Sequence, residues 1–353
     1  METSITPQDV IGKDPLGRFL FRLRLAPWQA ALLSFSIFLI YMIVLPAFLG
    51  TLMPRDGLDR SSLVDRVNMV GFFVIHPVAI FFYVWQPKAM AELYHIVIPL
   101  APVEKQAGAL RASRILHATS RIWLFGLFVG LGVMYLGFVY VSNFIGDRWY
   151  SSNWVMAIFL QLSRFLMFYL IIIVLARHLV MAFNLNRVYQ QIRLPVLIGQ
   201  SKYGVSFDAI TRYGLWFAVF GGVLGMFIGM RFFWSEPLFP EDMIYLILYL
   251  LLVPISFALP FWQAHVSMRR AKVDSIRAIS DTLQSEYDRL MRDLAANVSE
   301  KESDRISTLR YLLEMTEKAP TWPFENWDFY RVLVATVFPF AMTGIGVLIE
   351  MII

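Results

Sequence analysis

Cysteine is absent from this chain of 353 residues, and charged residues make up only 16% of it. Without cysteine there are no disulfides, thiolate metal sites or cysteine nucleophiles. The short motifs of zinc proteases, P-loop proteins, serine hydrolases and EF-hands are missing as well, so the sequence predicts a protein that is not an enzyme and has no cofactor or metal. Hydrophobic residues reach 58% and the mean hydropathy is +0.59, which excludes a soluble globule and indicates an all-α polytopic membrane protein.

Seven apolar stretches are interpreted as transmembrane helices, which rise about 1.5 Å per residue across a hydrocarbon core of roughly 30 Å. They are residues 28–49, 68–85, 122–144, 154–176, 215–230, 243–262 and 332–353. The helical pattern of the fourth stretch continues through 178–191 without Gly or Pro, so we expect this helix to project from the membrane. The third stretch is rich in glycine, which permits a close approach between helices.

Residues 264–328 interrupt the apolar pattern with 10 Lys+Arg and 12 Asp+Glu. Apolar side chains recur there in steps of three and four, the stripe of a coiled-coil helix. The first stripe is Ile276, Ile279, Leu283, Tyr287, Leu290 and Leu294, and the second is Ile306, Leu309, Leu313 and Thr316. Two striped helices joined by a short turn predict an antiparallel helical hairpin outside the bilayer. The predicted organisation is a six-span membrane bundle with cytoplasmic loops (1–263), the hairpin (264–328) and the seventh transmembrane helix (329–353).

The basic residues indicate how the chain is oriented. Segments 1–27, 87–119 and 183–212 carry four Lys+Arg each, whereas 51–66, 144–153 and 233–242 carry three, one and none. Basic loops face the cytoplasm in most membrane proteins. The sequence therefore predicts an integral protein of the plasma (inner) membrane with a cytoplasmic N-terminus, a cytoplasmic hairpin and a C-terminus outside. The basic pI is explained by these loops, so we expect no nucleic-acid partner.

Arg164 stands ten residues into the fourth span, near the membrane midplane, where a charge costs at least about 2.5 kcal/mol. Gln161, one turn away, and His76, at mid-depth of the second span, are its polar neighbours by depth. One interpretation is a hydrated cavity that binds a small-molecule ligand or forms part of an ion path. The other is an arginine that caps carbonyl groups released by a helix break at His76–Pro77.

Thr336, Thr343 and Glu350 recur at intervals of seven in the seventh span and share one stripe. Such a stripe suits a water-lined path in an oligomer, with Glu350 at the outer mouth favouring cations. Helix packing through a small polar seam explains the same stripe.

This layout resembles the seven-transmembrane ion channel superfamily of insect odorant and gustatory receptors, in topology only. The likeness lies in the cytoplasmic N-terminus, the prolonged fourth and sixth helices, and a last helix divided into a cytoplasmic part (about 304–318) and a membrane part (329–353). The Thr-Tyr and Gln-Phe signature of gustatory receptors is absent from 332–353. The resemblance implies a homotetramer whose last helices line a central cation pore and whose hairpins pack together.

Two functional hypotheses follow. The first is an oligomeric membrane channel or channel-like sensor that self-associates through its cytoplasmic hairpin. The second is a non-conducting membrane scaffold or accessory subunit that docks partner proteins through the hairpin. A transporter is disfavoured, because the chain lacks an internal repeat with paired broken helices.

Overall fold

The computed structural model describes residues 4–54, 61–143, 148–151, 153–190, 205–234, 240–293, 300–319, 321–322, 330–331, 334–338, 341–342 and 345. Within these residues the chain is helical and has no strand. Five helical stretches are long and apolar enough to cross a membrane, namely Pro27–Leu49, Arg66–Val97, Val103–Val139, Trp154–Tyr189 and Ala209–Arg231. The protein is therefore an all-helical, polytopic integral membrane protein.

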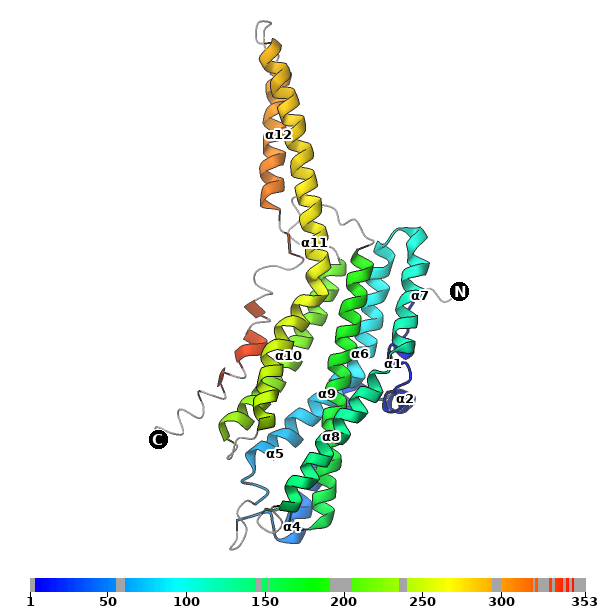
Figure 1. The fold of residues 1–353 in the computed structure, drawn as a ribbon, viewed down its shortest axis with the longest axis vertical. Helices are drawn as coiled ribbons and strands as arrows, with labels where there is room; N and C mark the ends of the chain where they lie inside the picture. Colours follow the sequence, from blue (N-terminus) through cyan, green and yellow to red (C-terminus); the bar gives the residue numbers. More distant parts are fainter. Residues whose placement is uncertain are drawn as a thin grey trace.

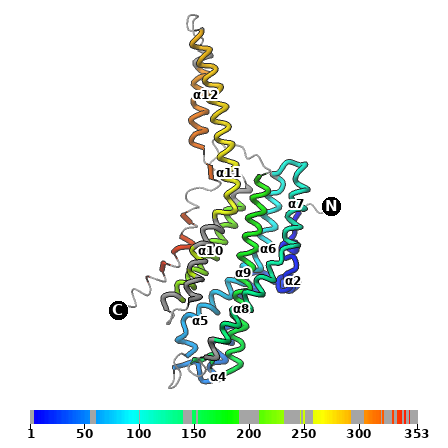
Figure 2. Tube along the Cα trace, in the orientation of Figure 1, coloured from blue at the N-terminus to red at the C-terminus, as the bar shows by residue number. Residues whose placement is uncertain are grey.

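The helices form an elongated bundle from which one long pair projects (Figures 1 and 2). In chain order they are α1 (Pro7–Ile11), α2 (Pro15–Arg22), α3 (Pro27–Leu39), η1 (Ile40–Val44), α4 (Leu45–Leu49), α5 (Arg66–Val70), η2 (Gly71–Ile75), α6 (His76–Val97), η3 (Ile98–Leu100), α7 (Val103–Thr119), α8 (Ile122–Asn143), α9 (Trp154–Tyr189), α10 (Val205–Trp234), α11 (Pro240–Asp293) and α12 (Glu300–Lys318).

Pro46 and Pro77 lie in the first turn after the π-helices η1 and η2. Proline has no amide hydrogen and its ring collides with the carbonyl group four residues earlier, and a wider turn relieves that collision. For Pro46 that carbonyl belongs to Met42, and it accepts a hydrogen bond of 2.6 Å from Ser62 Oγ. The chain therefore stays helical through His76–Pro77, where the sequence suggested a break.

Glycines on α8 bring this helix close to α9. A β-carbon on Gly130 would lie 2.8 Å from the ring of Phe165, and one on Gly126 would lie 3.0 Å from Ile173. Gly137 faces the carboxamide of Gln161 even more closely. Gly132, in contrast, meets nothing within 4 Å. Three glycines of the third predicted span thus allow the close helix approach that its composition suggests.

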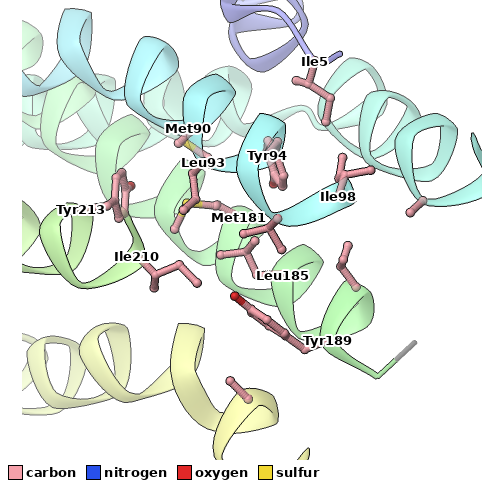
Figure 3. Packing of buried hydrophobic residues seen from close by; sticks show 14 of the residues in the cluster. Ile5, Met90, Leu93, Tyr94, Ile98, Met181, Leu185, Tyr189, Ile210 and Tyr213 are labelled. Carbon is pink, nitrogen blue, oxygen red and sulfur yellow. The ribbon is translucent and has the colours of Figure 1, made fainter. Parts of the chain in front are cut away.

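Two helical stretches are too long for the bilayer. The 32 residues of Arg66–Val97 and the 36 of α9 measure about 48 and 54 Å, against a core of roughly 30 Å. At one end of the bundle the ends of α6 and α9 join α1, α7 and the beginning of α10 around a separate apolar cluster (Figure 3). Its largest fully buried side chains include Met90, Leu93, Tyr94 and Tyr189.

The helix α11 runs without interruption over 54 residues, through Pro254 and Pro260. Its second half projects beyond the bundle, and α12 lies antiparallel beside it (Figure 1). Arg305 pairs with Glu286 at 2.8 Å across the two helices, and the Lys272 Nζ donates to the carbonyl oxygen of Ala319 at 2.8 Å. At the base, the rings of His265 and Trp322 stack 4.0 Å apart.

The predicted spans compare with the helices as follows. Most ends of the first, third, fourth and fifth predicted spans lie within a few residues of a helix end. The fifth differs at its start, because α10 begins earlier than residue 215. The helix of the second span continues to Val97, beyond the predicted span end at residue 85, as the helix of the fourth continues to Tyr189. The sixth lies inside α11, and most of the seventh lies outside the described residues. The described positions of the two hairpin stripes are mostly half-buried, with Tyr287 exposed and Thr316 buried, and Leu294 lies outside the described residues.

Candidate functional site: a cavity inside the helical bundle

A cavity of about 330 Å³ lies within the bundle. Its walls come from α5, η2, α6, α8, α9, α10 and α11, and Thr336 of the C-terminal segment also lines it. Most of the lining is apolar, with Phe72, Met167, Phe217 and Phe227 among the larger side chains. A few polar groups interrupt it, which is the usual composition of a ligand site.

Arg164 on α9 lines this cavity and is half-buried. Among the described residues it forms no hydrogen bond or ion pair; the charged groups that act on it through space are Arg231 on α10 and Asp65 at the N-terminus of α5. Arg231 also lines the cavity. A guanidinium held in an apolar environment is costly unless a charge or hydrogen bond compensates it. Arg164 therefore gives the cavity wall a positive charge that has no hydrogen-bond or ion-pair partner among the described residues.

Asp65 is already engaged by other donors. Its Oδ2 accepts from Trp149 Nε1 at 3.0 Å and from Asn68 Nδ2 at 2.7 Å. Burial raises the pKa of the nearby Tyr150, which lies in the connection before α9 and remains a neutral phenol. Asp65 is therefore the one carboxylate among the described residues that acts on Arg164. It precedes α5 in the chain, outside the predicted spans, so comparing the depths of residues within the spans did not connect it with this arginine.

His76 lines the same cavity from the start of α6 and is 2% exposed. Its ring centroid lies 4.3 Å from that of Phe38 and 5.7 Å from that of Phe72. The structure thus brings together His76 and Arg164, which the sequence grouped by depth only. The alternative role for Arg164, capping of carbonyl groups at His76–Pro77, has no supporting hydrogen bond among the described residues.

Gln161 is fully buried on the same helix as Arg164, one turn toward its N-terminus. Neither its Oε1 nor its Nε2 has a hydrogen-bond partner, and the carboxamide lies against Gly137, which lines the cavity. An unpaired buried amide costs roughly 1–3 kcal/mol. Gln161 itself does not line the cavity, because it is fully buried behind Gly137.

Of the three residues proposed to line a pore, the structure describes only Thr336. Thr336 is 4% exposed, lines the cavity, and its carbonyl oxygen accepts from the Tyr249 hydroxyl at 2.7 Å. Thr336 therefore faces the interior of its own chain. Thr343 and Glu350 lie outside the described residues, so their role in a pore stays a prediction.

A second polar centre, which sequence reasoning missed, joins the N-terminal segment to the bundle. Asp14 Oδ2 accepts from Arg177 Nη2 at 2.6 Å and from the Tyr83 hydroxyl at 2.5 Å. Its Oδ1 accepts from the Tyr169 hydroxyl at 2.6 Å and from the Gly17 amide at 3.2 Å. The carboxylate and the guanidinium are only 4% and 3% exposed.

The signal for this centre in the sequence was weak. Asp14 precedes Pro15 and caps α2, as many surface aspartates do. Arg177 comes directly after the apolar run of the fourth span, where an arginine normally reaches water. Only the packing of α2 against α6 and α9 shows that both are buried.

Comparisons with known proteins give no match: no family model, curated protein or solved structure is similar to this chain. Nothing in them links it to the insect odorant and gustatory receptors. The resemblance to that superfamily stays one of predicted layout, and the function has to be argued from the cavity.

Proposed function

We propose that this protein is a channel-like sensor of the plasma (inner) membrane, whose bundle cavity binds an amphipathic organic anion. The observation that supports this best is Arg164, which faces an apolar cavity and donates no hydrogen bond to any described residue. Arg231 lines the same cavity. A ligand with one anionic group and an apolar body would compensate the guanidinium and cover the aromatic lining.

The size of the cavity agrees with such a ligand. A volume of about 330 Å³ lies at the lower end of the range for small-molecule sites, roughly 300–1,000 Å³. The charge of Arg164 opposes the passage of cations through this cavity, so a cation path would lie elsewhere.

The test is binding of a fluorescent fatty acid and its methyl ester to the purified protein in detergent. Arg164→Gln should weaken binding of the acid about tenfold or more, because a charge-assisted hydrogen bond contributes about 1.5–3 kcal/mol. Binding of the ester should stay unchanged. Arg187→Gln is the matched control, since Arg187 is exposed near the other end of α9. Equal affinity of wild-type protein for acid and ester would rule out an anion site.

The topology in this proposal has seven spans, with the N-terminus and the hairpin in the cytoplasm. Support comes from the arrangement of the chain: α7, the end of α9 and the hairpin lie toward one end of the bundle, and α4, the end of α8 and the start of α9 lie at the other (Figure 1). The first group adjoins the segments rich in Lys and Arg. This segregation of charge is what the positive-inside rule expects.

If the protein conducts, we propose that it is an oligomer with a cation pore. In that version the last helices of several copies line a central path through Thr343 and Glu350. Cysteine introduced at these positions in the cysteine-free chain should react with water-soluble thiol reagents, whereas cysteine at Leu333 or Leu348 should not. Protection at Thr343 would favour a packing seam over a pore.

A non-conducting scaffold is the second candidate function. It is favoured by α12, which packs against α11 outside the bundle and exposes charged residues along its outer side. A scaffold predicts that deleting the hairpin abolishes partner recruitment and leaves fatty-acid binding intact. The sensor hypothesis predicts that deletion disrupts self-association, measured as the mass of the detergent-solubilised complex.

A further inference from the structure

We propose a second binding site, independent of the bundle cavity, that takes the phosphate of an anionic phospholipid headgroup between α2 and α6. The site is a separate cavity of about 590 Å³. Its walls come from α1, α2, the connection to α3, α6 and α9. Among the described residues that line it there is no aspartate or glutamate.

Three cations without an acidic partner line this cavity. Arg22 ends α2, Arg24 follows in the connection to α3, and Lys88 lies on α6; all three are exposed. Within the described part of the chain none of them forms an ion pair or a side-chain hydrogen bond. The fourth cation on the wall, Arg177, is neutralised by Asp14. The net charge facing the cavity is therefore strongly positive, which suits a phosphate.

The backbone at Arg24 supports a binding role. The φ angle of Arg24 is 52°, in the left-handed region. Among the described residues, Arg24 is the only one other than glycine with a positive φ. Such a conformation is unfavourable for an arginine and persists where the surroundings impose it, often at a ligand site. Here it places Arg24 at the rim of the cavity, beside Arg22.

The position of the cavity matches the level of lipid headgroups. The first candidate span begins at Pro27, three residues after Arg24. Trp85 on α6 comes three residues before Lys88, and Trp28 is exposed at the start of α3. Tryptophans of this kind mark the boundary between hydrocarbon and water. Since Arg22 and Arg24 belong to the basic segment 1–27, the cavity would face the leaflet that carries most anionic lipid in the topology proposed above.

The remaining walls suit the apolar part of a lipid better than a free ion. Leu20, Phe21, Leu25 and Val84 line the same cavity as the three cations. On its outer side, α2 exposes Phe19 (57%) and Leu23, as an amphipathic helix at a membrane surface does. A free phosphate would use only the cations, whereas a phospholipid would cover both kinds of surface.

Native mass spectrometry of the full-length protein in neutral detergent provides the test. The probes are phosphatidylglycerol, phosphatidylcholine with the same acyl chains, and inorganic phosphate. The triple variant R22Q/R24Q/K88Q should lose affinity for phosphatidylglycerol on the order of a hundredfold, since each cation near a membrane surface contributes about fivefold. Its affinity for phosphatidylcholine should not change.

The matched control K105Q/R111Q/R269Q removes the same numbers of lysines and arginines from exposed positions outside the cavity. It should bind phosphatidylglycerol like wild type; an equal loss in both variants would overturn the site in favour of diffuse attraction. Binding of inorganic phosphate as tight as that of phosphatidylglycerol would show a free-anion site instead. If the triple variant does not fold, Leu25→Trp fills the cavity with every charge in place, and undiminished phosphatidylglycerol binding would overturn the proposal.

Discussion

Replacing Asp14 by asparagine removes the charge at the buried centre that attaches α2 to the bundle. The carboxylate accepts hydrogen bonds from Arg177, Tyr83, Tyr169 and the Gly17 amide. Asparagine keeps the shape and can still cap the helix, but it presents an amino group to two of these donors. Arg177 would then be a buried cation with no charge to balance it.

The expected loss is large because solvent does not screen this pair. Removing one member of a buried ion pair costs about 3–5 kcal/mol, as the remaining charge stays desolvated. We expect this loss for Asp14→Asn and also for Arg177→Met. The double variant removes both charges, so its loss should be no greater than that of the worse single variant. The coupling free energy of the pair would then be about 3 kcal/mol or more.

The measurement is unfolding in mixed micelles with increasing sodium dodecyl sulfate, together with limited tryptic digestion near Arg18 and Arg22. Undocking of α2 should expose these arginines to trypsin before the bundle unfolds. Asp9→Asn is the control: its ion pair with Arg114 is 3.6 Å long and about 30% exposed, so we expect a loss of about 1 kcal/mol. Equal losses for Asp14→Asn and Asp9→Asn, or additive losses in the double variant, would refute the reasoning.

Three further predictions follow from the fold. A reporter after Ile353 should lie outside the cell and one inserted at Asn297 in the cytoplasm, and labelling of both on the same side would contradict seven spans. Gly137→Val should lower stability by about 1–3 kcal/mol in thermal unfolding, since the new side chain collides with Gln161; an unchanged midpoint would mean that α8 and α9 can separate. Ser62→Ala should cost about 1–3 kcal/mol in the same assay, because it leaves a buried carbonyl group without its donor, and Ser62→Thr should retain part of that stability.

Most helix positions could be predicted from the sequence, because they depend on local properties. An apolar run of about 20 residues has no stable place in water, so composition alone indicates where the chain crosses the membrane. The start of α9 at Trp154 and its continuation to Tyr189 followed from hydrophobicity and the lack of Gly or Pro. Side-chain caps reinforce such boundaries, as Asn153 does by accepting from the Val155 amide at 2.8 Å.

Part of the candidate site could also be recognised, since a charge deep in an apolar run is visible in the sequence. Arg164 stood out for this reason, and depth along the helix suggested His76 as a neighbour. Depth does not say which way a helix is turned. The sequence therefore did not show that Arg231 shares the same cavity, or that Asp65 acts on Arg164 from a loop.

By itself the sequence determined the class of protein, an all-helical membrane protein, and the approximate ends of its helices. The tertiary structure decided which polar groups meet. Asp14 and Arg177 are 163 residues apart and each looks like an ordinary residue at a helix end. Their burial depends on how α2 is rotated and seated against α6 and α9, and that geometry comes from packing of whole helices, which no short stretch of sequence encodes.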